Sequence, residues 1–273
     1  MGFVQTKDGT EIFYKDYGTG RPVVLIHGWP LNADMWEDQA LGLANQGFRV
    51  IAYDRRGFGR SDQPLSGYDY NTLSDDLASV MDQLDLQDAT LVGFSMGGGE
   101  VARYMSRHGG KRVSKAILVA AVPPFLLKTD DNPDGVDGSV FDGFIEALHK
   151  DRPHFLAGFG KKFYGASILS FEISAELLQW SSMMALQGSL PATIACVNSF
   201  GRTDFRPDMA HFKVPTLVIH GTADETVPFE ISGKRAAEMI PGAVLKTYEG
   251  APHGLHFTEK NRLTADIAEF ARG

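Results

Sequence analysis

The sequence predicts an α/β fold: a mostly parallel sheet of about eight strands, flanked by helices and carrying a helical cap. Short, continuously apolar segments such as 22–26 are typical of strands buried on both faces. Amphipathic segments such as 71–84 alternate with them, and strand–helix repetition predicts a parallel sheet. From about 123 to 210, aromatic-rich helical stretches replace the buried strands. We therefore expect a core of residues 1–122 and 211–273 and an inserted helical cap over 123–210.

The predicted core elements follow in order along the chain. Segment 11–17 alternates polar and apolar residues, as an edge strand does, and a Gly-Thr-Gly turn separates it from the next strand. Apolar residues recur at helical spacing in 71–84, which predicts one buried helix face. The expected strands are 11–17, 22–26, 48–53, 89–92, 115–122, 216–220 and 244–248. The expected helices are 35–45, 71–84, 98–105, 229–239 and 258–271 in the core, with 141–150, 153–163, 175–186 and 191–200 in the cap.

The composition is that of an ordinary globular protein with an acidic balance. The chain has 273 residues, and 26 Lys and Arg against 34 Asp and Glu give a formal net charge of -8. This acidity argues against nucleic acid or an anionic membrane as the main partner. No apolar run reaches the roughly 18 residues typical of a transmembrane helix. The single cysteine, Cys196, excludes an internal disulfide, and the first ten residues lack the plan of a signal peptide, so we expect a cytoplasmic protein.

The most informative motif is Gly93-Phe94-Ser95-Met96-Gly97, which lies between an apolar, β-branched segment and a helical one. In strand–turn–helix context, G-x-S-x-G places the serine on a sharp, strained bend where its hydroxyl can attack a substrate. The two motif glycines let the strand and the helix approach without side-chain clashes. The glycines 97–99 also resemble a phosphate loop, but no lysine follows them. The motif therefore predicts a nucleophile at Ser95.

A nucleophilic serine needs an imidazole to accept its proton and a carboxylate to orient that imidazole. Asp224 and His253 each follow a predicted strand, and the chain order Ser95, Asp224, His253 fits such a triad on a parallel sheet. His256 is the main rival to His253, and Glu225 adjoins Asp224. His220 precedes a glycine at a strand end, which indicates a structural role; the histidines on polar positions, read as surface residues, are His108, His149, His154 and His211.

An oxyanion formed at this serine needs backbone N–H donors. One donor is expected from Met96, directly after the nucleophile at the start of a helix. The second should come from the loop after strand 22–26, which reads His27-Gly28-Trp29-Pro30. Proline has no N–H, so Trp29 becomes the expected donor, and Pro30 restricts the geometry of the residue before it.

The charged run at 54–62 allows two interpretations. Its arginines could bind phosphate or another anion, or the run could be a charged turn that ties loops together near the site. We favour the charged turn. No metal-ligand spacing such as H-E-x-x-H or paired C-x-x-C occurs, so no metal site is expected.

With these residues in hand, the chain resembles the α/β-hydrolase fold superfamily, and in particular the cofactor-free bacterial haloperoxidases (perhydrolases) and the related aryl esterases. The resemblance covers nearly the whole chain. The segments that carry it are 27–31, 53–64, 93–104, 203–208 and 251–254. Leu255-His256-Phe257 departs mildly from the family pattern after the histidine, which could alter the acyl pocket.

The resemblance implies Ser95 as nucleophile, His253 as general base, Asp224 as its orienter, and the N–H groups of Trp29 and Met96 as the oxyanion hole. It implies hydrolysis of small carboxylic esters and perhydrolysis of carboxylic acids with hydrogen peroxide. In this family the released peracid oxidises halide in solution, so the haloperoxidase activity requires no haem, metal or other cofactor. The proline after Trp29 favours perhydrolase competence, and the often oligomeric family members suggest a homo-oligomer.

An apolar pocket with few polar groups suits small acyl or aryl esters, because such pockets bind by shape and burial. The cap helices supply phenylalanines at roughly helical spacing that could form its walls or simply the core of the cap. The candidate wall residues are Trp29, Pro30, Phe94, Val122, Phe125, Phe144, Phe159, Phe163, Trp180 and Val227.

Other functions fit the same sequence pattern. A γ-lactamase, or another amide or carbon–carbon hydrolase, could use the same triad. Haloalkane dehalogenases and epoxide hydrolases of this fold carry an aspartate at the elbow, so Ser95 argues against both. A receptor that holds a small ligand without turning it over can retain all three residues, and only a turnover measurement separates it from an enzyme.

Overall fold

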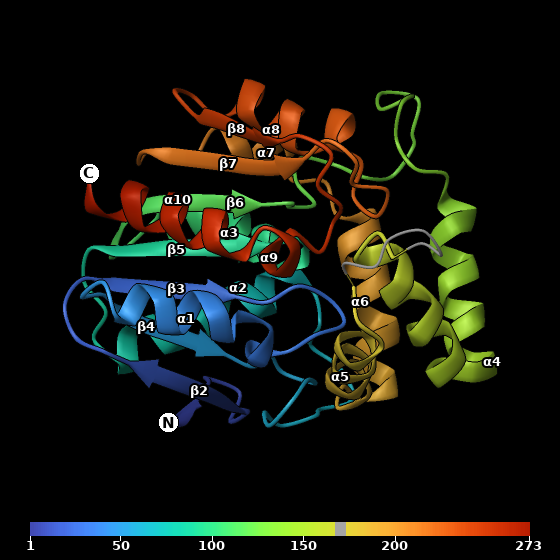
Figure 1. Ribbon diagram of the computed structural model, residues 1–273, viewed down its shortest axis with the longest axis horizontal. Helices are drawn as coiled ribbons and strands as arrows, with labels where there is room; N and C mark the ends of the chain where they lie inside the picture. Colours follow the sequence, from blue (N-terminus) through green and yellow to red (C-terminus); the bar gives the residue numbers. More distant parts are fainter. Residues whose placement is uncertain (167–172) are drawn as a thin grey trace.

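The structure is a computed structural model that describes residues 1–166 and 173–273. Within these two ranges, eight strands form one sheet in the order β1-β2-β4-β3-β5-β6-β7-β8 (Figure 1). β1 and β2 pair antiparallel, as do β2 and β4, and the remaining neighbours are parallel, which confirms the predicted fold class. The strands are β1 Gly2–Gln5, β2 Glu11–Tyr17, β3 Pro22–Ile26, β4 Arg49–Tyr53, β5 Ala89–Phe94, β6 Val113–Val119, β7 Thr216–Gly221 and β8 Val244–Tyr248.

The strand order reverses direction at β3, the strand from which the chain crosses first to β4 and later to β5 on the other side. In open parallel sheets, ligands bind in the crevice beyond the carboxyl ends of the strands at such a reversal. Ile26 at the end of β3 is in register with Gly93 near the end of β5, so the loops after these two strands are neighbours. The sheet topology therefore brings the His27–Pro30 loop beside Ser95.

Helices cover both faces of the sheet, and this explains the continuously apolar strands. All six residues of β5 are buried. α1 and α10 pack together on one face, while α2 and α3 pack together on the other (Figure 1). The core helices are α1 Glu37–Ala44, α2 Tyr70–Gln83, α3 Met96–Arg107, α8 Gly233–Met239, α9 Leu255–Thr258 and α10 Lys260–Arg272, with short 3₁₀ turns η1 Ala33–Trp36 and η2 Phe229–Ile231.

The segment between β6 and β7 forms helices, most of which lie beyond the carboxyl ends of the parallel strands, while the last, short one packs against α3 and α8 (Figure 1). They are α4 Gly138–Phe163, α5 Ala175–Leu186, α6 Leu190–Arg202 and α7 Arg206–Met209, and α4 packs against α5 and α6. The backbone N–H of Phe205 donates to the carbonyl of Pro124 at 2.8 Å, which joins the two ends of this segment. The boundaries at 123 and 210 stay a prediction.

Helix α4 shows why the sequence predicts a break at 151–152. Asp151 has non-helical dihedral angles (φ -159°, ψ 85°), and Pro153 follows two residues later. Proline lacks the N–H that would continue the helix and clashes with the preceding turn. The carboxylate of Asp151 accepts a hydrogen bond from the backbone N–H of His154 at 3.0 Å, which caps the second half of α4. The two expected helices thus form one kinked element.

Several element boundaries differ from the prediction for local reasons. The strand expected at 115–122 ends at Val119, because Ala120 takes a positive φ of 44° and the chain turns into the site. The helix expected at 229–239 is divided at Ser232 (φ -123°, ψ -92°), which separates a 3₁₀ turn from α8. A further strand, β1, precedes the first strand expected from the sequence and pairs with β2 through four residues.

Candidate active site

Ser95 lies at a strained turn between β5 and α3. Its dihedral angles are φ 53° and ψ -118°, a conformation that side chains rarely adopt. The turn requires glycines on both sides: a Cβ added at Gly93 would lie 2.5 Å from the carbonyl oxygen of Gly97. A Cβ added at Gly97 would lie 2.6 Å from the carbonyl oxygen of Ile26. The motif glycines therefore let β5, α3 and the end of β3 meet closely enough to place the serine above the sheet.

Ser95, His253 and Asp224 form one hydrogen-bonded chain. The Nε2 of His253 lies 3.0 Å from the Oγ of Ser95, and its Nδ1 lies 2.6 Å from the Oδ2 of Asp224. Asp224 lies in the loop after β7 and His253 in the loop after β8. All three residues are buried. The structure brings together the three residues that the sequence singled out, in the geometry that proton transfer from the serine requires.

The carboxylate of Asp224 is held by several donors. Its Oδ1 accepts the backbone N–H groups of Thr226 at 2.9 Å and Val227 at 2.8 Å. Burial raises the pKa of Asp224, but the neighbouring His253 and hydrogen bonds from His220 and His253 outweigh burial and hold that pKa well below its usual range. The group is therefore a carboxylate at any pH near neutral, and Nδ1 of His253 must carry a proton to bond with it.

Two backbone N–H groups near Ser95 are available to a ligand. Within the described part of the chain, no hydrogen bond uses the N–H of Met96 or that of Trp29. Met96 opens α3, where the helix dipole favours negative charge, and Ser95 provides no side-chain cap. The Trp29 indole donates to the carbonyl of Thr193 on α6 at 3.0 Å, and the Trp29–Pro30 peptide bond is cis. These two N–H groups remain our candidates for an oxyanion hole.

A narrow apolar cavity of about 50 Å³ opens beside the serine. Five of the expected wall residues line it: Trp29, Val122, Phe144, Phe159 and Val227. The sequence reasoning missed further lining residues, which are Leu126, Val136, Val140, Phe141, Phe200 and Thr226. Phe141 and Phe200 belong to predicted cap helices, and Thr226 is two residues from Asp224. These three could have been predicted from the sequence, because they lie in the cap or beside a candidate catalytic residue.

The other expected wall residues lie elsewhere. Phe94 and Phe163 pack against the ring of His253, with centroids 5.0 and 4.8 Å away, and so help to hold that ring in place. Pro30 is buried in the loop after β3. Phe125 packs against the guanidinium of Arg206 at 4.9 Å. None of these four residues lines the cavity beside Ser95.

Trp180 of α5 does not line the cavity either, and its side chain is 36% exposed. Leu177, Ser181 and Met184 are the buried residues at helical spacing on that helix. Trp180 follows Leu177 by three residues and precedes Met184 by four, so it lies at the edge of this buried face and stays partly exposed. The sequence prediction placed Trp180 in a pocket wall, and the structure places it on the surface of the cap.

A wider, open cavity of about 610 Å³ adjoins the narrow one and shares five lining residues with it, which are Val136, Val140, Phe144, Phe159 and Thr226. It lies between α4, both halves of which contribute residues, and the loop after Asp224. The Nζ of Lys162 and the Oε2 of Glu225 lie 4.0 Å apart at its edge, and both side chains are more than half exposed. The narrow cavity, which we call the inner chamber, thus opens to solvent through this outer vestibule.

The arginines of the 54–62 run are paired within the protein. Arg55 binds the carboxylate of Glu100 on α3 and donates to the carbonyl of His27 at 2.6 Å. Arg60 donates to both Asp54 and Asp34 at 2.7 Å. The loop therefore connects β3, β4 and α3, as expected of a charged turn. Both guanidinium groups are paired with carboxylates of the protein itself.

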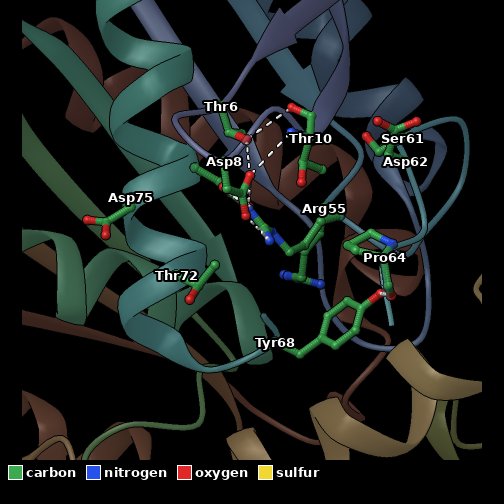
Figure 2. Close-up of polar contacts among 12 residues, drawn as sticks. Thr6, Asp8, Thr10, Arg55, Ser61, Asp62, Pro64, Tyr68, Thr72 and Asp75 are labelled. Atoms are coloured by element: carbon green, nitrogen blue, oxygen red, sulfur yellow. Dashed lines mark hydrogen bonds and ion pairs between the residues drawn. The ribbon is translucent and has the colours of Figure 1, made fainter. Parts of the chain in front are cut away.

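The same run also anchors the turn between β1 and β2. Arg56 donates to Asp76 of α2 at 2.5 Å and to Asp8 of the turn at 2.9 Å. Figure 2 shows Asp8 beside Thr6 and Thr10. The hydroxyl of Thr6 donates to the carboxylate of Asp8 at 2.5 Å, and the backbone N–H of Thr10 donates to it at 3.2 Å. Burial raises the pKa of Asp76 to about 6, against the opposing effect of Arg56.

His256, the rival to His253, lies behind the site and does not contact the serine. Its ring packs against Phe94 and Phe163, with centroids 5.1 and 5.9 Å away. Burial, together with the nearby His253, lowers the pKa of His256 to about 3. His108, another of the histidines considered from the sequence, has its Nε2 2.8 Å from the Oδ1 of Asp75. The described residues contain no cluster of three or more His, Cys, Asp or Glu side chains placed to bind a metal ion.

Comparison with known proteins identifies the family. Residues 21–260 match the family described as the alpha/beta hydrolase fold. The chain belongs to this family. It is 44% identical to a non-heme chloroperoxidase of Kitasatospora aureofaciens over 99% of each chain, and 42% identical to a bifunctional esterase/perhydrolase of Acinetobacter calcoaceticus over 100% of each chain.

Among solved structures, this α/β hydrolase is similar to a bromoperoxidase from Bacillus anthracis. The TM-score is 0.96 at 44% identity, and the match covers 100% of this chain and 99% of the other. The names of these relatives agree with the resemblance seen in the sequence. No helix in the described ranges has both the length and the apolar character that crossing a membrane requires.

Proposed function

We propose that the protein hydrolyses esters of short carboxylic acids through Ser95, and that it also transfers the acyl group to hydrogen peroxide. The observation that carries the proposal is the continuous Ser95–His253–Asp224 chain, whose serine lines the apolar inner chamber. The esterase/perhydrolase and haloperoxidase relatives support both activities. The substrates are a small ester or carboxylic acid with water or hydrogen peroxide.

In the first half of the reaction, the Nε2 of His253 accepts the proton of Ser95 as the serine Oγ attacks the ester carbonyl. The negative charge that develops on the carbonyl oxygen is stabilised by the N–H groups of Met96 and Trp29. Asp224 stabilises the imidazolium that forms. Collapse of the intermediate breaks the ester C–O bond, and His253 returns the proton to the leaving alcohol, which leaves Ser95 acylated.

In the second half, water or hydrogen peroxide attacks the acyl group while His253 removes a proton. Water gives the carboxylic acid, and hydrogen peroxide gives the peracid; in both cases the serine hydroxyl is regenerated with the proton from His253. A carboxylic acid can enter by the reverse of the water step, which makes peracid from acid and peroxide. The resemblance to the cofactor-free haloperoxidases implies that free peracid then oxidises halide in solution.

The size of the inner chamber sets the acyl group. About 10–15 Å³ of such space holds one water, so a chamber of about 50 Å³ holds roughly four water-sized groups. An acetyl or propionyl group fits this volume. The wider vestibule of about 610 Å³ would take the leaving group, and its apolar lining by Phe144, Phe155 and Phe159 suits an aryl alcohol.

The test measures turnover of p-nitrophenyl acetate by the wild type and by Ser95→Ala. We expect the variant to lose about 10⁶-fold in kcat, as a missing triad nucleophile does. Turnover in the variant at the wild-type level would refute the serine mechanism. An absence of turnover in a folded wild-type protein would favour a ligand receptor.

A second assay adds acetate, hydrogen peroxide and bromide to an indicator dye that bromination bleaches. Bleaching by the wild type above the Ser95→Ala control would demonstrate perhydrolysis. Equal rates in both proteins would leave a plain esterase. The cytoplasmic location and the homo-oligomer stay predictions, the first resting on the single, buried Cys196.

A further inference from the structure

A second imidazole contacts the carboxylate of Asp224. His220 is the penultimate residue of β7, and its side chain is fully buried. Its Nε2 lies 2.9 Å from the carbonyl oxygen of Val227 and 3.3 Å from the Oδ2 of Asp224. This is the same carboxylate oxygen that accepts from His253 at 2.6 Å. The sequence indicated only a structural role for His220, and the mechanism above does not use it.

The neighbours of His220 define which of its nitrogens carries a proton. A carbonyl oxygen can only accept, so the Nε2 that faces Val227 must be the N–H donor. The Nδ1 has no hydrogen-bond partner within the described residues. It faces α8 so closely that a Cβ at Gly233 would lie 2.4 Å away. A proton on Nδ1 would be buried without an acceptor, so the ring is a neutral donor through Nε2 alone.

The loop from Asp224 to Val227 is fixed at both ends by this arrangement. The Oδ1 of Asp224 accepts the N–H groups of Thr226 and Val227, while His220 holds the carbonyl of Val227 and contacts Oδ2. Val227 also lines the inner chamber beside Ser95. One buried ring therefore contacts both the orienting carboxylate and the residue that forms the chamber wall.

We propose that His220 is a positioning residue of the triad, whose shared Nε2–H holds the Asp224 carboxylate toward His253 and fixes Val227 in the chamber wall. The inference rests on the proposed function, since it assumes that the triad is active. A donor on Oδ2 also draws negative charge away from His253, because a hydrogen-bonded carboxylate is less basic. Removing the donor should therefore stabilise the protonated form of His253.

The groups that surround His253, Asp224 and His220 add little net charge. On the side of His253 lies His256, which stays uncharged near neutral pH because burial, together with His253, lowers its pKa to about 3. At the surface, Glu225 and Lys162 lie 4.0 Å apart, so their opposite charges largely offset each other. From η2, the uncharged ring of Phe229 packs against His220 with centroids 5.7 Å apart. A shift in the pH profile of a His220 variant therefore reports on the contact with Asp224.

The experiment compares two substitutions at this position in the full-length protein. His220→Leu removes the donor, whereas His220→Gln places an amide N–H near the site of the original Nε2. The readout is the pH profile of kcat/KM for p-nitrophenyl acetate, normalised to the sites that react with a fluorophosphonate. This titration counts protein with a reactive Ser95, so a failure of the proposed function appears as absent labelling in the wild type.

For His220→Leu we expect kcat per active site to fall about tenfold, because a hydrogen bond to a charged group contributes about that factor at its lower end. We expect the acid limb of the profile to move up by about half a pH unit. His220→Gln should retain the wild-type limb and most of the rate. An unmoved acid limb in the leucine variant, or an equal shift in both variants, would overturn the proposal.

If the leucine variant does not fold, the wild-type protein decides the matter by ¹⁵N NMR of its histidine rings. The His220 ring, assigned through its contact with Phe229, should show a protonated Nε2 and an unprotonated Nδ1 at pH 7. A protonated Nδ1, or a fully protonated ring, would overturn the proposal without any substitution.

Discussion

Acid should destabilise the fold through His256, the buried histidine behind the site. In the unfolded chain this group takes up a proton near pH 6.5, whereas in the folded protein its pKa is lowered to about 3. Between these values the unfolded state binds more protons, so the stability that depends on neutral His256 is complete above pH 6.5 and is lost as the pH falls. Over the 1.5 units from pH 6.5 to 5.0, at 1.36 kcal/mol per unit, the loss is about 2 kcal/mol.

The assay is urea unfolding at pH 7.5 and pH 5.0 for the wild type and for His256→Leu. Leucine matches the histidine in volume and suits the aromatic surroundings of Phe94, Phe163 and Tyr164. The Nδ1 of His256 has no hydrogen-bond partner in the described part of the chain, so its removal breaks no bond of that atom. The variant should therefore lose about 2 kcal/mol less than the wild type on acidification.

The matched control is the exposed His149, where the same substitution should leave the pH dependence unchanged. The reasoning is refuted if His256→Leu and the wild type lose equal free energy of unfolding between the two pH values. Other buried histidines, such as His27, contribute in both proteins and cancel in the comparison. The measured difference is thus specific to the ring at 256.

Two further predictions concern the loop network and the chamber. Arg55→Leu should lower the free energy of unfolding by about 3–5 kcal/mol in urea titrations, because it leaves the Glu100 carboxylate buried without its partner. Replacing Glu100 with leucine as well should restore much of that loss, and a double variant no more stable than the single one would contradict this. Phe159→Ala should raise the kcat/KM ratio of p-nitrophenyl hexanoate to acetate about tenfold, since the inner chamber then accepts a longer chain. Phe155, which lines only the vestibule, is the control, and an unchanged ratio in Phe159→Ala would show that Phe159 does not limit the acyl group.

The sequence was most informative about candidate site residues that directly follow a strand. Ser95 was recognisable because a glycine-flanked serine between a strand and a helix permits few backbone geometries. Asp224 and His253 follow strands β7 and β8, and parallel strands deliver the residues after them to a common edge. These positions depend on local pattern plus one topological rule, and both can be read from a linear chain.

The cap was harder to predict because its helices are apolar on more than one side. Helix α5 carries Leu177, Trp180 and Met183 within two turns, so periodicity could not tell that none of them lines the chamber. Val136 likewise lines the chamber from outside any helix that the sequence predicted. The contact of His220 with Asp224 depends on how a four-residue loop folds back on its strand, which no local pattern specifies.

The hydrogen bond between Phe205 and Pro124 has a consequence for how such a protein can change. It holds the two ends of the long segment between β6 and β7 close together. The two strands are therefore joined across a short distance, whatever the length of the chain between Pro124 and Phe205. The entropy of closing a loop grows only with the logarithm of its length. Helices could thus be added, removed or transplanted from a related protein above an unchanged serine, and new substrate preferences could arise by exchange of one contiguous gene segment.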